Sequence, residues 1–233
     1  MESIGSIART VIAILAGVLL RLGGSPADAH ALDGGLRIYA VNVIKTPPFE
    51  KPFIGYGIYL GGGLVITAAH VVGHWPSVTH PTVRVAGKDV PTQLIKEGSF
   101  QRTDLALLSV DETRLPVSLR TRHNRLCTTM PFVGMEVIDV LPKHKSRARV
   151  ISPLSIAPNL RDRFNTLIDS PEESGSGIFD AQRRYLLGIM SAKMPKYIYQ
   201  FRNGAIVAKP NGFAGYFVPA SKISAFIPAN FRF

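Results

Sequence analysis

The fold is first indicated by Val65-Ile66-Thr67-Ala68-Ala69-His70-Val71-Val72, an apolar run that ends in small residues and a histidine. Two other stretches have a similar form. Asp104 stands at the head of the apolar run Leu105–Val110, and Ser174 opens the glycine-flanked turn Ser174-Gly175-Ser176-Gly177. Each polar residue therefore lies at the end of a predicted strand, where loops can converge, and its small neighbours leave space for a peptide to approach.

Working outward, the chain from about Leu36 consists of short apolar runs separated by Gly, Pro and charged clusters. These runs are Ile54–Leu60, Leu64–Thr67, Leu105–Val110, Met135–Leu141, Arg147–Ile151, Tyr185–Ser191 and Gly215–Val218. Gly61-Gly62-Gly63 predicts a hairpin turn, because glycine accepts positive φ at little cost. Short helical turns are expected at His70–Gly73 and Ser221–Ile227, and the segment Leu115–Leu126 is expected to cross between two lobes. Many short strands with tight turns predict an all-β sandwich or a pair of barrels.

The composition is that of a folded globular protein. Of 233 residues, 46% are apolar and 18% are charged, which excludes a disordered or fibrous chain. The single cysteine, Cys127, excludes an intrachain disulfide and is expected to be a small buried residue. His70 and His74 are four residues apart, as metal ligands on one helical face are, but no third ligand is apparent. No metal site is therefore expected.

The chain is strongly basic, with 27 Lys and Arg against 16 Asp and Glu and a formal net charge of +11. Lys143, Lys145, Arg147 and Arg149 alternate along the sequence, so a strand through them would carry one basic face. Such charge can attract nucleic acid, an anionic envelope surface or acidic substrates. No nucleic-acid motif is visible and aromatic residues do not interleave with the basic run. The basic excess is therefore interpreted as a solvated face, and no nucleic-acid partner is expected.

The three polar residues singled out above supply the chemistry of acyl transfer. That reaction needs a nucleophilic hydroxyl, a base to take its proton, and a carboxylate that holds the tautomer of the base. The chain offers His70, Asp104 and Ser174, in that order, each at the end of a predicted strand. These residues are the candidate catalytic groups.

The motifs resemble the three signatures of trypsin-like (chymotrypsin-fold) serine proteases. The resemblance rests on Ala68-Ala69-His70, Thr103-Asp104-Leu105-Ala106-Leu107-Leu108 and Ser174-Gly175-Ser176-Gly177, and it is greater to the disulfide-free bacterial branch related to HtrA-like protease domains. Tyr185–Ser191 resembles the strand after the nucleophile loop, and Gly215–Ala220 the strand that closes the specificity pocket. The resemblance covers residues 36 to 228, so no appended PDZ module is expected. It implies two six-stranded antiparallel β-barrels, residues 32–118 and 119–233, with the active site in the cleft between them.

The resemblance also implies a role for each site residue. His70 would act as general base and then as acid, Asp104 would orient and stabilise its imidazolium, and Ser174 would attack the carbonyl. The backbone N–H groups of Glu172 and Ser174 would form the oxyanion hole. A further set would shape the substrate site, with Ser191 behind Asp104, a peptide-binding edge at Ala192 and Lys193, and an apolar pocket near Ile168, Tyr216 and Phe217. A protein or peptide substrate is expected, with no metal or organic cofactor.

One departure from the family pattern concerns the loop before the nucleophile. Members usually have Gly two residues before the serine, whereas this chain has Pro171-Glu172-Glu173-Ser174. A side chain at that position costs about 1–2 kcal/mol if the backbone is left-handed. Loss of one oxyanion donor lowers turnover about 10²–10³-fold. The sequence thus predicts a serine endopeptidase, with a catalytically weak or inactive protease-fold module that binds peptides or an anionic surface as the alternative.

The first residues of the chain have the order of a secretory signal. Arg9 precedes the apolar run Val11–Leu20, and small-x-small cleavage sites follow at residues 27–29 and 29–31. A periplasmic or secreted location is expected, with residues 1–31 as a signal peptide. Arg21 directly after the apolar run leaves open an uncleaved anchor, so membrane association through this segment or through the basic surface is a second expectation.

Overall fold

The structure is a computed structural model that describes residues 35–47, 51–73 and 81–231. The described residues from Leu36 onward fold as one compact unit. The predicted signal or anchor at 1–31, together with His74, lies outside the described residues. Among the described residues, no helix is long and apolar enough to cross a membrane.

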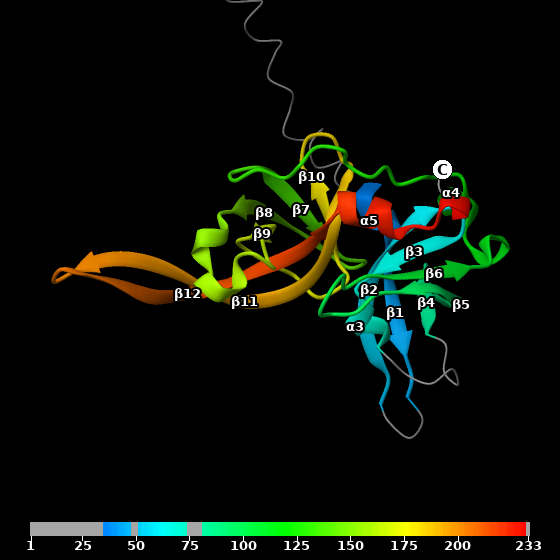
Figure 1. Cartoon of the computed structure of the whole chain (residues 1–233). Coiled ribbons are helices and arrows are strands. Elements are labelled where there is room, and N and C mark those ends of the chain that lie inside the picture. The colour runs from blue at the N-terminus through cyan, green and yellow to red at the C-terminus, as the bar shows by residue number, and fades with distance from the viewer. Residues whose placement is uncertain (1–34, 48–50, 74–80, 232–233) are drawn as a thin grey trace, which may run out of the picture. The chain divides into compact units, whose positions relative to one another are not determined.

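The first half of this unit is a closed antiparallel barrel of six strands (Figure 1). Its strand order is β1-β2-β3-β6-β5-β4, and pairing of β1 with β4 closes it. The strands are β1 (Ala40–Lys45), β2 (Phe53–Gly61), β3 (Leu64–Thr67), β4 (Thr82–Val85), β5 (Lys88–Glu97) and β6 (Ala106–Val110). The predicted glycine turn joins β2 to β3, with φ of 108°, 58° and 71° at Gly61, Gly62 and Gly63.

The second half is another closed barrel, with strand order β10-β11-β12-β9-β8-β7. Pairing of β7 with β10 closes it. The strands are β7 (Glu136–Val140), β8 (Lys145–Ile151), β9 (Leu167–Ile168), β10 (Gly177–Asp180), β11 (Leu186–Arg202) and β12 (Ala205–Pro219). The prediction of two six-stranded antiparallel barrels is therefore confirmed. Both β11 and β12 are much longer than the runs Tyr185–Ser191 and Gly215–Val218 expected from the sequence.

Helical segments are short and connect or flank the strands. They are η1 (Gly35–Tyr39), α3 (Ala69–Val72), η2 (Glu112–Arg114), α4 (Val117–Arg120), η3 (Pro153–Ser155), η4 (Pro158–Leu160), α5 (Ala220–Phe226) and η5 (Ala229–Phe231). The expected helical turns at His70–Gly73 and Ser221–Ile227 correspond to α3 and α5. The boundary predicted between residues 118 and 119 falls inside α4, in the segment that connects β6 to β7.

The two barrels share one apolar core. A single cluster of buried side chains contains Ile58 and Leu105 from the first barrel and Ile138, Phe179 and Ile189 from the second. Burial of this surface, at about 25 cal/mol per Å² of apolar area, holds the barrels side by side. The relative position of the two barrels, and of the candidate site residues that they carry, is therefore fixed by this packing.

Polar contacts add to this junction. The Arg37 guanidinium donates two hydrogen bonds to the main-chain oxygen of Pro142, at 3.1 and 2.8 Å. Lys96 donates to the main-chain oxygen of Phe226 at 2.9 Å, which ties β5 to α5. The predicted basic face on β8 is also present, because Arg147 and Arg149 are exposed while Ala148 and Val150 are buried. Cys127 is buried, as expected.

Candidate active site

His70 and Asp104 meet at the edge of the first barrel. His70 lies in α3, directly after β3, and Asp104 lies two residues before β6. The Nδ1 atom of His70 is 2.7 Å from Oδ2 of Asp104, and the main-chain N–H of His70 donates to Oδ1 at 3.0 Å. With Nδ1 as the donor, Nε2 of the imidazole is an acceptor. The carboxylate thus fixes both the position of the ring and the tautomer that a general base requires.

A third hydrogen bond reaches the Asp104 carboxylate from the second barrel. Ser191 Oγ on β11 donates to Oδ2 at 2.6 Å. The Asp104 side chain is only 3% exposed, and burial by itself raises its pKa. The hydrogen bonds from His70 and Ser191 and the charge of the imidazolium outweigh burial, so the pKa of Asp104 lies below its ordinary value. Asp104 is therefore a carboxylate at neutral pH.

Ser174 lies in a tight turn that contacts both barrels. The next residue, Gly175, has φ of +87°, and a Cβ there would lie 1.9 Å from the main-chain oxygen of Tyr56. Gly175 N–H donates to Met190 on β11 at 2.9 Å, and Tyr56 N–H on β2 donates to the oxygen of Ser174 at 3.3 Å. Only glycine fits this position, and its close approach to β2 fixes the backbone of Ser174 against that strand.

Ser191 contacts two of the three candidates, Asp104 and Ser174. Its hydroxyl donates to Asp104, while its main-chain oxygen accepts a hydrogen bond from Ser174 Oγ at 3.3 Å. Ser174 and Asp104, which are distant in the sequence, thus contact one and the same residue of β11. The Ser174 hydroxyl points to the Ser191 oxygen in this conformation, and Ser174 is partly exposed. Rotation of such a side chain occurs within nanoseconds, so this orientation is not a barrier to other partners.

The loop before Ser174 is held away from the expected oxyanion geometry. The main-chain N–H of Glu172 donates to Oδ2 of Asp139 at 2.9 Å. Asp139 lies on β7 and is fully buried, with the Ser176 hydroxyl next to the same carboxyl. The Glu172 hydrogen that was expected to line an oxyanion hole is therefore bound to a protein carboxyl in this conformation.

Three other contacts hold the same loop. His144 Nε2, in the β7–β8 turn, is 3.1 Å from Oε2 of Glu172, and Lys193 Nζ is 3.1 Å from Oε1 of Glu173. Pro171 packs against β12 so closely that a Cβ at Gly215 would lie 2.3 Å from the Pro171 Cβ. Each loop residue from 171 to 173 thus has its own contact. Lys193, expected at the peptide-binding edge, is one of these contacts.

Burial makes Asp139 costly to ionise, and this leads to a prediction about stability. Desolvation raises its pKa from 3.8 to about 7, with a smaller contribution from the Glu172 carboxylate, against the opposing effects of Ser176, the Glu172 N–H and Lys193. A carboxyl whose pKa is raised in the folded state destabilises the fold above that pKa, and the penalty vanishes below the unfolded value. Asp139→Asn is therefore expected to raise the free energy of unfolding by about 2–4 kcal/mol at pH 8.5.

Denaturant titrations at pH 8.5 and pH 4.5 measure this effect. The difference between the wild type and Asp139→Asn should shrink as the pH falls from 8.5 toward 4.5, since both proteins then carry a neutral side chain when folded. Asp180→Asn provides a control, because Asp180 is also buried but its carboxylate accepts two hydrogen bonds, from the main-chain N–H groups of Gln182 and Arg183. A pH-independent gain for Asp139→Asn would contradict the assignment.

The fold and this geometry can be compared with known proteins. No family model matches the chain, and no curated protein matches its sequence. Solved structures do match. The Rv3671c protease of M. tuberculosis in its active form is 16% identical with a TM-score of 0.56, and the match covers 87% of this chain and 85% of that one. The serine endoprotease of Yersinia pestis is 18% identical with a TM-score of 0.56, over 87% of this chain and 66% of that one.

The chain has the fold of the trypsin-like serine proteases. The MamO protease domain of Magnetospirillum magneticum also matches, at 21% identity and a TM-score of 0.52, over 83% of this chain and 97% of that one. At sequence identities of 16%, 18% and 21%, these matches show that the fold is similar and do not assign a function to any residue. The roles of individual residues depend on the geometry described above.

The residues expected around a trypsin-like specificity pocket are mostly in the core. Ile168 and Phe217 are completely buried in one apolar cluster of the second barrel, and so they present no surface to a substrate in this conformation. Tyr216 is buried on the opposite side of β12, where its ring packs edge-on against Phe164 at 5.0 Å. Ala192 is partly exposed on β11. Tyr216 and Phe217 were expected near the base of the pocket, and because successive strand residues point to opposite faces, the two side chains lie on different sides of β12.

Phe100 is a site residue that the motifs did not indicate. Its ring is 5.8 Å from the His70 imidazole in an edge-on arrangement, and the Arg163 guanidinium lies 5.2 Å from the ring centroid. Phe100 comes from the β5–β6 connection and covers one side of the imidazole. The available sequence signal was an aromatic residue four positions before Asp104.

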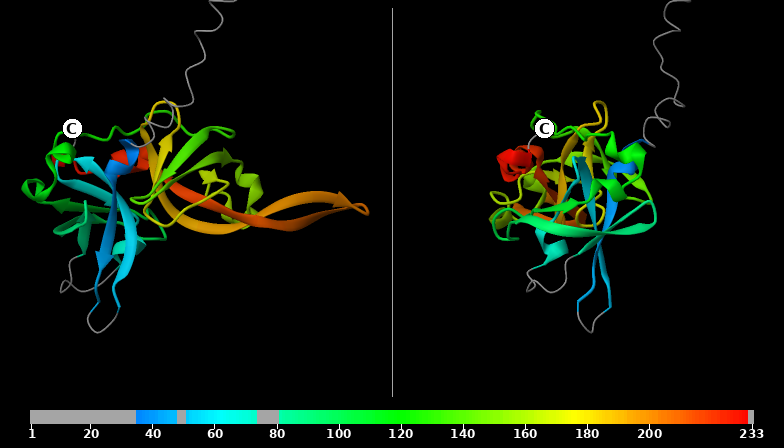
Figure 2. Two further views of the ribbon diagram at one scale, coloured as in Figure 1. Left: turned by 180° about the vertical axis from the view of Figure 1, so that it is seen from behind. Right: turned by 90° about the vertical axis from the view of Figure 1, so that its right-hand side faces the viewer.

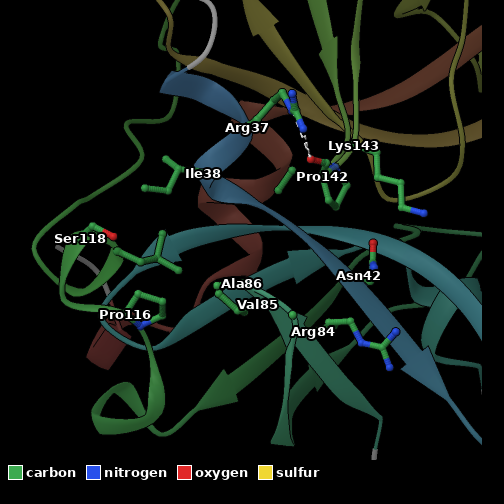
Figure 3. Close-up of a pocket in the computed structure, with 13 residues that line it drawn as sticks. Arg37, Ile38, Asn42, Arg84, Val85, Ala86, Pro116, Ser118, Pro142 and Lys143 are labelled. Carbon is green, nitrogen blue, oxygen red and sulfur yellow. Dashed lines mark hydrogen bonds between the residues drawn. The ribbon is translucent and has the colours of Figure 1, made fainter.

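A separate pocket of about 460 Å³ lies between η1, β4 and the β7–β8 turn (Figure 3). Its lining includes Arg37, Arg84 and Lys143 and none of the candidate catalytic residues. Arg37 is bound to Pro142, as the dashed line in Figure 3 shows, and Arg84 pairs with Asp89 at 2.6 Å. Arg84 is therefore paired with an acidic side chain, and Arg37 is held by a main-chain oxygen. In the part of the chain that the structure describes, no group of His, Cys, Asp and Glu is arranged to hold a metal ion.

Proposed function

We propose that the protein is a serine endopeptidase that cleaves peptide bonds through an acyl-enzyme. The single observation that carries this proposal is the contact of Ser191 with both Asp104 and Ser174, beside an Asp104–His70 hydrogen bond of 2.7 Å. A base whose tautomer is held by a buried carboxylate, and a hydroxyl in a glycine-fixed turn that shares a neighbour with that carboxylate, are the groups that nucleophilic acyl transfer needs.

The reaction follows from these contacts. Ser174 Oγ turns from the Ser191 oxygen toward Nε2 of His70, which takes its proton as the oxygen attacks the peptide carbonyl. Asp104 stabilises the imidazolium that forms, since its carboxylate already accepts the Nδ1 hydrogen. His70 then gives the proton to the leaving amine, and Ser174 keeps the acyl group. Water, deprotonated by the same Nε2, releases the acyl group and restores the hydroxyl.

The loop at Pro171–Glu173 has to rearrange before peptide cleavage can proceed at its full rate. An oxyanion needs the N–H groups of Ser174 and Glu172, and the Glu172 N–H is bound to Asp139 in the resting conformation. A peptide that binds the open conformation better than the resting one shifts the population by its difference in affinity. The substrate is thus expected to assist in setting the loop.

The edge at Ala192 and Lys193 is the proposed position of the substrate backbone. Lys193 would exchange its Glu173 partner for the substrate or for solvent when the loop moves. An exported location is supported by the order of residues in the predicted signal, and the protein would then act in the periplasm or outside the cell.

Labelling with a fluorophosphonate probe tests the proposal, because the probe reacts with activated serine hydroxyls whatever the physiological substrate is. The wild type is expected to label, and Ser174→Ala is expected to lose labelling completely. Ser176→Ala is the matched control, since Ser176 is fully buried two residues away and faces Asp139. A wild type that does not label between pH 6 and pH 9 would favour the alternative of a protease-fold binding module.

A further inference from the structure

The strands β11 and β12 continue past the second barrel as a two-stranded hairpin. Figures 1 and 2 show this hairpin, in orange, projecting away from the barrels. Pairing runs without interruption from Tyr197 opposite Pro210 to Arg202 opposite Ala205. The turn residues Asn203 and Gly204 have φ of 48° and 79°, the pair of positive values that matches the twist of a hairpin. The projection is therefore a regular, well-formed element.

Large apolar side chains on this hairpin are exposed. Phe201 and Ile206 face each other across the strands at the tip and are 75% and 74% exposed. Ile198 and Val207, on the other face, are 45% and 47% exposed. An isolated two-stranded hairpin is at best marginally stable in water, and a contiguous exposed apolar surface marks an interaction site.

Contacts with the rest of the protein occur only near the base of the projection, among the described residues. The Tyr199 hydroxyl donates to the oxygen of Ile156 at 3.2 Å, and Arg161 donates to the same hydroxyl at 3.2 Å. These bonds hold the base of the hairpin against the η3–η4 segment. Beyond Tyr199, at the tip, the side chains of Phe201 and Ile206 are exposed to solvent.

The charge around the tip has one sign. Lys193, Lys196, Arg202 and Lys209 are the charged residues of the two strands, and the hairpin contains no Asp or Glu. The same bias extends further, because Asp180 is the last acidic residue of the chain, while eight Lys and Arg follow it. A partner of this surface must therefore be anionic as well as able to accept apolar side chains.

We propose that the hairpin tip docks on an anionic lipid surface. Phe201 and Ile206 would enter the headgroup region, and Arg202 and Lys209 would lie among the lipid phosphates. Amphipathic elements bind such surfaces through apolar area together with electrostatic attraction. The unpaired outer edges of the two strands restrict the tip to the interface, since backbone groups without partners are not tolerated in the hydrocarbon core. The hairpin tip contains none of the candidate catalytic residues, so this proposal does not depend on peptidase activity.

Fluorescence at the tip provides a direct test in the full chain. The single tryptophan, Trp75, is first replaced by phenylalanine, and Phe201→Trp then places the only indole at the tip. Vesicles of phosphatidylcholine with 30% phosphatidylglycerol are expected to shift the emission to the blue, whereas vesicles of phosphatidylcholine alone should not. Phe132→Trp in the same background is the control, because Phe132 is also exposed but lies outside the hairpin. The indole at position 201 reports the surroundings of the tip itself, independently of any membrane binding through residues 1–31.

A charge variant completes the test. Because the replaced cations are exposed, the packing of the core stays intact. Arg202→Gln with Lys209→Gln is expected to weaken vesicle binding of the tip probe about 30-fold, since each cation near an anionic surface strengthens binding about fivefold. Absence of a blue shift with anionic vesicles, or an equal shift with neutral vesicles, would overturn the proposal. A blue shift that depends on protein concentration without vesicles would instead identify a second copy of the chain as the occupant.

Discussion

Replacing Asp104 by asparagine is expected to lower kcat/KM about 10⁴-fold while the fold is retained. The reason lies in the tautomer of His70. The carboxylate accepts hydrogen bonds from Nδ1 of the ring and from the main-chain N–H of the same residue. An asparagine amide group facing the ring can donate to Nδ1, which moves the ring proton to Nε2. A protonated Nε2 cannot take the proton of Ser174, and so the nucleophile is not activated.

The measurement is the rate of fluorophosphonate labelling and of peptide cleavage, with thermal unfolding to show that the variant is folded. Ser191→Ala is the matched control, because it removes one donor to the same carboxylate and leaves the tautomer of His70 unchanged. A loss of about 10–100-fold is expected there, the value of one hydrogen bond to a charged group. If Asp104→Asn loses no more activity than Ser191→Ala, the carboxylate does not control the base.

Much of the fold could be predicted because its signals are local. The apolar runs at 54–60, 64–67 and 135–141 became β2, β3 and β7, and the glycine triplet took the positive φ values that it indicated. The three polar candidates lie next to strand ends, so their motifs were visible in the sequence. The contact of His70 with Asp104 follows from the barrel order, in which β3 and β6 are neighbours.

The remaining features depend on contacts that no short stretch contains. Asp139 occupies a strand whose residues from 137 to 140 are all buried, so the alternation of polar and apolar residues does not mark it. Its partner Glu172 belongs to a loop that only the closed barrel brings near. The projecting hairpin is a different case. Asn203-Gly204 is a strong hairpin signal, and it was available in the sequence without being used.

Asp139→Ala, which removes the buried carboxyl, is expected to raise kcat/KM about 10–100-fold. In the resting loop this carboxyl accepts the Glu172 N–H at 2.9 Å, and that N–H is the one an oxyanion needs. A hydrogen bond to a charged group contributes about 1.5–3 kcal/mol, which limits the gain to this range. One oxyanion donor contributes a factor of about 10²–10³ to turnover. The variant is expected to gain less than this, because His144 and Lys193 still hold the acidic side chains of the loop.

Asp139→Asn separates this effect from a general loosening of the loop. Asparagine keeps an acceptor oxygen in the same place, so the Glu172 N–H stays bound. Its hydrogen bond is about half as strong as that of a charged carboxylate, so a gain smaller than that of Asp139→Ala is expected above pH 7. Amide hydrogen exchange provides a measurement that does not depend on turnover: the Glu172 N–H should be protected in the wild type and in Asp139→Asn, and unprotected in Asp139→Ala. Equal exchange in all three proteins would show that the carboxyl does not restrain the loop.

The pH dependence of this gain has a defined sign. The pKa of Asp139 is raised to about 7, chiefly by burial, with Glu172, Ser176 and Lys193 as the groups that face it. Above pH 7 the carboxylate is charged and binds the Glu172 N–H most strongly, whereas a neutral carboxyl forms a bond about half as strong. The ratio of kcat/KM between Asp139→Ala and the wild type is therefore expected to fall as the pH is lowered from 8.5 to 6. A ratio that rises at low pH would contradict the role assigned to Asp139.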